Sequence, residues 1–317
     1  MGKDKLINGI NRCRLSGSYK TQYNHRLEAQ RFVQQLRENG YGVQKWENVN
    51  NKHVASVVDA WREKGLSDKT IKEYLAGVRA VASAYGNDKI SSSNADFGLE
   101  RGTSSPTNID KSANEQVYRE VVEKLANSSD INEQRLSVQI EYMRELGLRH
   151  EEARKLDALH AERQYSPSGQ EYIKITDGTK GGKERWVPVS AKAAQALERG
   201  AALQKEYGTK NLMDPRMSER QWERFAYKTA RSAGMTRENG CTFHGLRHSF
   251  AQELFRAKAG FDAPVKYGSK EEFQAAARAA AGDNWKQNYE RACRSVESAL
   301  GHGQNRSDVR GIYIGRI

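Results

Sequence analysis

Apolar residues recur at intervals of three and four along most of this chain, and this spacing restricts it largely to α-helix. The clearest stretch runs from about Ser67 to Tyr85, where Ile71, Leu75 and Val78 share one face of the predicted helix. Similar stripes predict further helices over 21–40, 51–64, 115–126, 131–146, 191–206, 218–232 and roughly 269–300.

Two short β-like runs, 171–175 and 184–189, flank a glycine-rich turn and predict a β-hairpin. The expected fold class is therefore mainly α with a small β-hairpin or sheet. Lys180 lies in the turn, where its ammonium could be offered to a phosphate. An exposed turn lysine is the other interpretation, and by itself the residue favours that one.

Composition changes over residues 91–114, which are rich in serine, asparagine and threonine, as is typical of a linker. Before it, residues 21–90 predict a compact helical domain. After it, residues 115–317 predict a second, mixed α/β domain. Residues 1–20 are basic and predict either an arm on DNA or a disordered, solvated terminus.

The net charge of +12 favours a polyanionic partner, which could be DNA, RNA or an anionic membrane surface. No apolar run approaches the length of a transmembrane helix, and the first residues lack the apolar core of a signal peptide. The three cysteines, Cys13, Cys241 and Cys293, have no metal-site spacing, so a reducing cytoplasm is expected. Cys241 is more simply a small core residue than a nucleophile.

Residues 242–251 carry His244 and Arg247 three positions apart, so both side chains can converge on one ligand from a helix face. A guanidinium suits a phosphate because its planar fork donates two hydrogen bonds and stays charged. Arg149 follows a helix-ending glycine, and Glu152 can orient its guanidinium. A solvated basic helix and a surface Arg–Glu pair are the simpler interpretations of each motif taken alone.

Taken in order, these motifs resemble the catalytic domain of the tyrosine recombinases, the phage-integrase family. The matching segments are 147–152 around Arg149, 179–181 around Lys180, 244–251 with His244 and Arg247, 300–302 with His302, and Tyr313. This resemblance spans residue 115 to the end. The helical segment 21–86 more weakly resembles the family's core-binding, SAM-like domain.

The resemblance implies a role for each residue. Tyr313 would attack a DNA phosphorus and form a 3′-phosphotyrosine, with His244 as its base. Arg149, Arg247 and His302 would stabilise the charge of the transition state, and Lys180 would protonate the departing 5′-oxygen. The covalent link conserves the bond energy, so no cofactor and no metal is expected.

Two features of the C-terminal part differ from the family pattern. The segment between Arg247 and His302 is unusually long, which predicts a helical insertion near 258–290. Four residues follow Tyr313, so we expect any coupling between subunits to use the insertion or the tyrosine helix.

The expected function is a site-specific DNA recombinase, most simply an integrase that inserts or excises a mobile element. The expected partners are double-stranded DNA, further copies in a tetramer on two recombination sites, and accessory DNA-bending or directionality factors, without a membrane. The expected location is the cytoplasm of a bacterium, on the nucleoid, with the protein encoded by the bacterium or a phage. The alternatives are a type IB topoisomerase-like activity and a catalytically inactive DNA-binding protein on the same scaffold.

Overall fold

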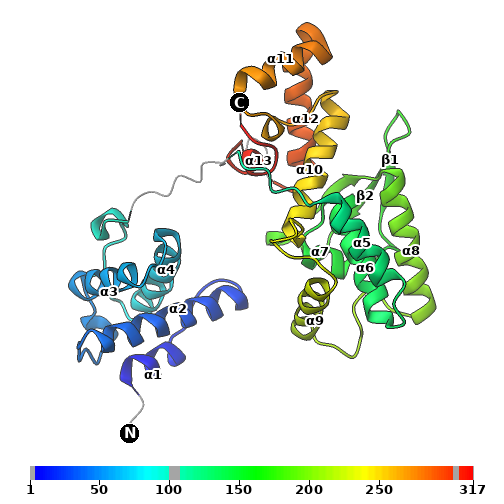
Figure 1. Cartoon of the computed structure of the whole chain (residues 1–317). Helices are drawn as coiled ribbons and strands as arrows, with labels where there is room; N and C mark the ends of the chain where they lie inside the picture. The colour runs from blue at the N-terminus through cyan, green and yellow to red at the C-terminus, as the bar shows by residue number, and fades with distance from the viewer. Residues whose placement is uncertain (1–3, 100–107, 303–306, 317) are drawn as a thin grey trace. The chain divides into compact units, whose positions relative to one another are not determined.

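The computed structural model describes residues 4–99, 108–302 and 307–316. The chain forms two compact units that divide between residues 104 and 105, called unit 1 and unit 2 below (Figure 1). Each unit has its own apolar core. Helix predominates in both, and the strands of the described residues form one small sheet. The fold class predicted from the sequence is confirmed.

Unit 1 is wholly helical. Its elements are α1 (Lys5–Arg12), α2 (Tyr19–Glu38), η1 (Trp46–Asn48), α3 (Asn51–Glu63), α4 (Asp68–Ala84) and η2 (Ala95–Phe97). The side chains of Ser18, Asn50 and Ser67 accept hydrogen bonds from the first turns of α2, α3 and α4, which fixes where these helices begin. Their apolar stripes meet in one core, in which Phe32 and Leu75 are fully buried.

The prediction of an arm over residues 1–20 is wrong for residues 5–12, which form α1 and pack into the core of unit 1. Leu6 and Ile10 lie four positions apart on one face and are fully buried. Trp46 donates from Nε1 to the carbonyl of Leu6 at 3.0 Å. This short apolar face was missed in the sequence because basic residues surround it.

Both ends of the predicted linker, 91–114, belong to folded units in the described residues, so the linker is shorter than predicted. Phe97 and Leu99 belong to the core of unit 1. On the other side, the backbone N–H of Ala113 donates to the carbonyl of Gly245 at 3.2 Å, so the chain is already packed on unit 2 there.

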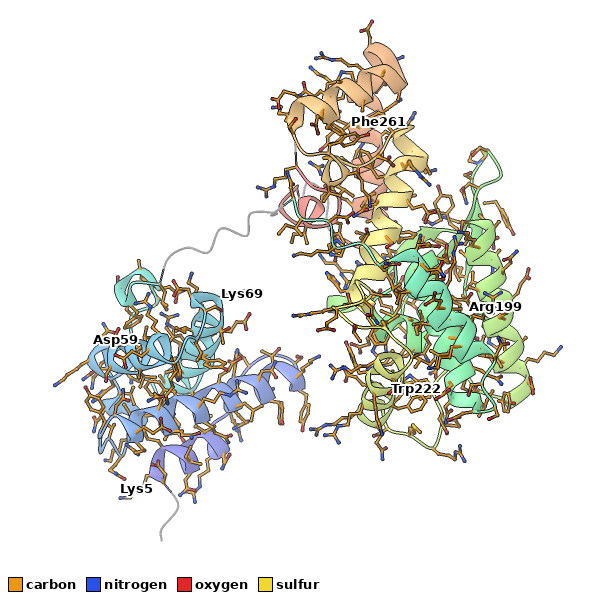
Figure 2. All side chains as sticks on the ribbon, viewed as in Figure 1. Lys5, Asp59, Lys69, Arg199, Trp222 and Phe261 are labelled. Carbon is orange, nitrogen blue, oxygen red and sulfur yellow. The ribbon has the colours of Figure 1, made fainter. Side chains whose placement is uncertain are left out.

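Unit 2 packs helices around two central ones, α6 and α10, which are buried on most sides. Its helices are α5 (Glu115–Ala126), α6 (Ile131–Glu145), α7 (His150–Lys155), α8 (Ala191–Tyr207), α9 (Glu219–Ser232), α10 (Phe243–Ala259), η4 (Pro264–Lys266), α11 (Lys270–Ala281), η5 (Gly282–Asn284), α12 (Trp285–Ala299) and α13 (Ser307–Ile314). Trp222 on α9 is fully buried and donates from Nε1 to Gln139 Oε1 on α6 at 3.1 Å (Figure 2).

The sheet is antiparallel with strand order β1 (Arg163–Tyr165), β2 (Glu171–Ile175), β3 (Arg185–Pro188). Ile173 pairs with Val187, and both are fully buried. The predicted hairpin is therefore present as β2 and β3, and the connection between them contains a short turn, η3 (Lys180–Gly182).

The long helix predicted over 269–300 is instead two helices, α11 and α12, because the chain turns at Gly282 with a φ of 54°. Aromatic rings join these helices to α10, among them Phe261, Phe273 and Tyr289 (Figure 2). Among the residues that the structure describes, every helix is too short or too polar to span a bilayer.

Candidate active site

The residues predicted to form a site lie on five separate elements of unit 2. Arg149 caps α7, His244 and Arg247 lie in the first turns of α10, His302 follows α12, Tyr313 is on α13, and Lys180 begins η3. His244, Arg247 and His302 meet around Tyr313, and Arg149 joins them through Glu152, which lies 3.8 Å from Arg247. The side chain of Lys180 lies outside what the structure describes.

The start of α10 is fixed locally. Thr242 is its N-cap and accepts a hydrogen bond at Oγ1 from the backbone N–H of Gly245 at 3.0 Å. This places His244 and Arg247 at the first helical positions with a shared face, as their spacing predicts.

The ring of Tyr313 is buried among three imidazoles and a guanidinium. Its centroid lies 5.6 Å from that of His244, 4.7 Å from that of His248 and 5.4 Å from that of His302. The Cζ atom of Arg247 is 5.7 Å from the same centroid. Only 6% of the tyrosine is exposed. The imidazoles around it can accept a proton, and the guanidinium can bind a negatively charged group.

Arg247 is held rigidly, with 1% of its surface exposed. It donates to the carbonyls of Gly147 and Leu300, which precede Arg149 and His302 in the chain. Burial and the charges of Arg149 and Arg185 lower the pKa of Arg247 to about 10, against the opposing effect of Tyr313. The group therefore stays positive at neutral pH and ties two other predicted site segments to α10.

Glu152 is the buried anion at the centre of these cations. Its oxygens accept from the Arg149 guanidinium at 2.8 Å and backbone N–H at 2.7 Å, and from both terminal nitrogens of Arg185 at 2.8 and 2.7 Å. Burial raises the pKa of its carboxyl, but the hydrogen bonds and charge of Arg185, followed by Arg149 and Arg247, hold that pKa below its usual value. The predicted pairing of Glu152 with Arg149 is confirmed.

Arg185 is a site residue that the sequence did not reveal. It lies on β3 with 6% exposed, and its Nε donates to the carbonyl of Ala299 at 2.7 Å. A Cβ at Gly301, where φ is 66°, would lie 2.8 Å from Cδ of Arg185, so this turn before His302 needs glycine. The available signal was strand alternation, since Arg185 shares the inward face of β3 with Val187.

His248 is the second residue that was missed. Only 1% of it is exposed, and its ring lies against the backbone and the ring of Tyr313. Burial and the charges of His244 and Lys111 lower its pKa to about 4, so the ring is neutral at physiological pH. Its position four residues after His244, on the same helix face, was the signal in the sequence.

His244 differs because part of its ring remains at the surface. Desolvation by the surrounding protein, then the charges of Arg247, Lys111 and Arg149, lower its pKa below the ordinary histidine value. A neutral imidazole next to a tyrosine can accept the proton of the hydroxyl.

Two other residues could be considered as nucleophiles, and both are unsuited. Burial raises the pKa of Cys241 to about 11, and the thiol is fully enclosed. Burial also raises the pKa of Tyr289, whose ring packs against Phe255 and Phe273.

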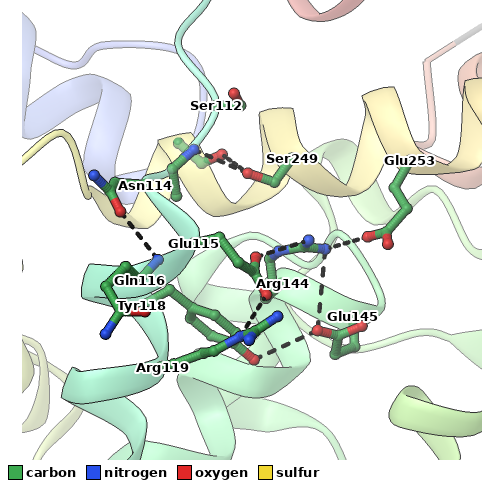
Figure 3. Close-up of polar contacts among 12 residues, drawn as sticks. Ser112, Asn114, Glu115, Gln116, Tyr118, Arg119, Arg144, Glu145, Ser249 and Glu253 are labelled. Atoms are coloured by element: carbon green, nitrogen blue, oxygen red, sulfur yellow. Dashed lines mark hydrogen bonds and ion pairs between the residues drawn. The ribbon is translucent and has the colours of Figure 1, made fainter. Parts of the chain in front are cut away.

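A buried guanidinium fixes α10 to the rest of unit 2. Arg144 on α6 donates to Glu253 on α10 at 2.6 Å and to Glu115 on α5 at 3.1 Å (Figure 3). Burial lowers the pKa of Arg144, but Glu253 and the neighbouring carboxylates raise it more. The helix that carries His244 is thereby held in register with α5 and α6.

Each of the two units matches a family model. A family model described as "Phage integrase, N-terminal" matches residues 7–91, and one described as "Phage integrase family" matches residues 115–267. The second match contains Arg149, Lys180, His244 and Arg247. His302 and Tyr313 lie beyond it and join the site by geometry.

Individual proteins agree with these matches. The chain is 28% identical over 225 residues to the tyrosine recombinase XerC of Actinobacillus pleuropneumoniae serotype 7 (strain AP76), which covers 68% of this chain and 69% of the relative. In fold it resembles the XerH site-specific recombinase bound to difH substrate, with a TM-score of 0.55, 17% identity and coverage of 92% and 76%. It also resembles the Tn1549 transposon integrase in complex with a circular intermediate DNA, with a TM-score of 0.56, 15% identity and coverage of 99% and 96%.

Proposed function

This chain belongs to the phage-integrase family of tyrosine recombinases, and we propose that it integrates or excises a mobile element by cutting and rejoining double-stranded DNA through Tyr313. The observation that supports this most is the enclosure of the Tyr313 ring by His244, His248, His302 and Arg247. The likeness to a transposon integrase supports the mobile element as the substrate.

The first step is a transesterification. The Tyr313 oxygen forms a bond to phosphorus, the bond from phosphorus to the 5′-oxygen breaks, and a 3′-phosphotyrosine results. His244 takes the proton of the tyrosine hydroxyl, and Lys180 gives a proton to the departing 5′-oxygen. Rejoining is the reverse reaction with a different 5′-hydroxyl.

The cations act on the phosphate. Arg149 and Arg247, with His302 as a further donor, bind the non-bridging oxygens more strongly as charge builds up in the transition state. Glu152 neutralises part of this cationic cluster and orients Arg149, so the donors are set before DNA arrives.

The larger assembly is part of the same proposal. Four copies would bind two recombination sites, with accessory DNA-bending or directionality factors. The bacterial source of the XerC relative supports action in the bacterial cytoplasm, on the nucleoid.

The experiment that tests this function uses nicked duplexes carrying candidate attachment sites, whose cleavage traps the covalent intermediate. A denaturing gel should show a protein–DNA adduct with the natural chain and none with Tyr313→Phe, while both bind the duplex equally. Binding without any adduct would leave a catalytically inactive DNA-binding protein. Relaxation of plasmids without site preference would instead indicate a type IB topoisomerase.

A further inference from the structure

The first residues of unit 2, 108–113, cross α10 close to the candidate site, and we call this segment the strap. The N–H of Ala113 lies 2.9 Å from Oγ of Ser249 and 3.2 Å from the carbonyl of Gly245 (Figure 3). A Cβ at Gly245 would lie 3.0 Å from the carbonyl oxygen of Lys111. The strap therefore lies directly on the helical turn that carries His244.

The other end of the strap holds the chain that follows Tyr313. The side chain of Asn108 donates from Nδ2 to the carbonyl of Arg316 at 3.2 Å and accepts at Oδ1 from the N–H of Arg316 at 2.8 Å. Asn108 has a φ of 48°, a conformation that few residues other than glycine, asparagine and aspartate adopt readily. A side chain that pairs with both backbone groups of one residue fixes the position of that residue.

A third contact links the middle of the strap to Tyr313 itself. Nε2 of Gln252 on α10 donates to Asp110 Oδ1 at 2.8 Å and to the carbonyl of Tyr313 at 3.3 Å. The other oxygen of Asp110 pairs with Lys266 Nζ at 2.6 Å. Asp110 thus orients the amide that holds the backbone of the tyrosine.

On its other side, the C-terminal segment packs closely against η4. A Cβ at Gly315, where φ is 82°, would lie 2.7 Å from the backbone nitrogen of Val265. The end of α13 is therefore seated between η4 and the strap, with no room for a side chain at Gly315.

We propose that the strap positions the nucleophile, with Asn108 and Asp110 as positioning residues that hold Tyr313 against His244 and Arg247. The proposal rests on the function assigned to Tyr313 above. Neither residue touches the reacting atoms, and both act through the backbone of α13 and its end.

The test compares Asn108→Gly with two matched variants. Glycine keeps the left-handed backbone and loses both contacts to Arg316, and Asn108→Asp keeps only the acceptor. Ile109→Ser is the control, because Ile109 is 61% exposed and lies between the two positioning residues. For each full-length protein we would measure single-turnover adduct formation on a nicked duplex as a function of DNA concentration, and hydrogen–deuterium exchange in the C-terminal peptide.

In Asn108→Gly we expect the rate at saturating DNA to fall about tenfold, which the loss of two ordinary hydrogen bonds allows. The DNA concentration for half-maximal rate should not change, and exchange around Tyr313 should rise. Asn108→Asp should lie between this variant and the natural chain, and Ile109→Ser should match the natural chain. An unchanged or higher rate in Asn108→Gly, or an equal loss in Ile109→Ser, would overturn the proposal.

Tyr313→Phe, measured in parallel, separates this proposal from the one on which it rests. Adducts formed by Tyr313→Phe would remove the nucleophile assignment, and with it the role of the strap in positioning that nucleophile. Adducts abolished by Tyr313→Phe but unaffected by Asn108→Gly would remove the role of the strap alone.

Discussion

His248 packs its ring against that of Tyr313, with centroids 4.7 Å apart and planes inclined by 40°. The imidazole is buried, and its pKa lies near 4, below the ordinary value of 6.5. It can therefore line the pocket of Tyr313 as a neutral ring, which leaves His244 as the proposed acceptor of the tyrosine proton.

This burial predicts a pH dependence of stability. Between pH 6.5 and 4 the unfolded chain binds a proton that folded His248 does not, so the free energy of unfolding falls as pH falls through this window. The loss from this one group reaches about 3 kcal/mol by pH 4. Urea unfolding of residues 105–317 should show it, and His248→Phe should have a shallower slope. Part of the slope will remain, because burial also lowers the pKa of His150 to about 4. Identical slopes in the two proteins would contradict the burial of a neutral His248.

The pair of Glu152 and Arg185 predicts strong coupling. Glu152→Gln leaves the buried charge of Arg185 without its anion, so this variant should cost about 3 kcal/mol or more in unfolding free energy. Arg185→Met should cost less, because Glu152 keeps its hydrogen bonds from Arg149. The double variant should lose much less than the sum of the two. A double-mutant cycle by urea unfolding of the same fragment measures the difference, and additive losses would show that the two groups do not stabilise each other.

Most helices and strands, and the order of the candidate site residues along the chain, could be predicted from the sequence. The residues that pack against the candidate site could not. The spacing of His244 and Arg247 is local to one helix, so the sequence carries it directly. Arg185 becomes a site residue only because β3 packs beside α12, and His248 only because α13 packs beside α10. No local pattern in the sequence encodes either approach. The N-terminal helix was missed although its signal is local. Basic residues outnumber the two buried apolar residues, Leu6 and Ile10, that determine its packing.

The cations should have separable roles. Losing Arg149 or Arg247 should cost on the order of 3–4 kcal/mol of transition-state stabilisation, or roughly a hundred- to a thousandfold in rate. Lys180→Ala should be slow on ordinary DNA but recover on a duplex whose 5′-bridging oxygen is sulfur, because a thiolate departs without a proton. Arg149→Ala and Arg247→Ala should stay slow on both, as single-turnover cleavage would show. Equal rescue of all three variants, or of none, would exclude Lys180 as the proton donor, and Lys183 would be tested next.

The two units should contribute jointly to DNA affinity. Phosphate contacts release counterions, so the affinity of the full chain should fall steeply with salt. A fragment of residues 105–317 keeps the strap and all the proposed catalytic residues but should bind more weakly and with a shallower salt dependence. Titrations of one duplex at several salt concentrations compare them, and equal affinities would mean that unit 1 does not contact DNA.

The central claim is that Tyr313 becomes covalently linked to DNA, and its most direct test is to find the linked residue. Trypsin cuts after Arg310 and Arg316, and the peptide between these cuts, residues 311–316, contains Tyr313 and no other hydroxyl, thiol or imidazole side chain. The adduct from a nicked duplex, digested with nuclease and trypsin, should yield this peptide carrying a 3′-phosphonucleotide in mass spectrometry. The account predicts that mass and fragments that place it on Tyr313. A nucleotide on any other residue, with 311–316 recovered unmodified, would contradict it.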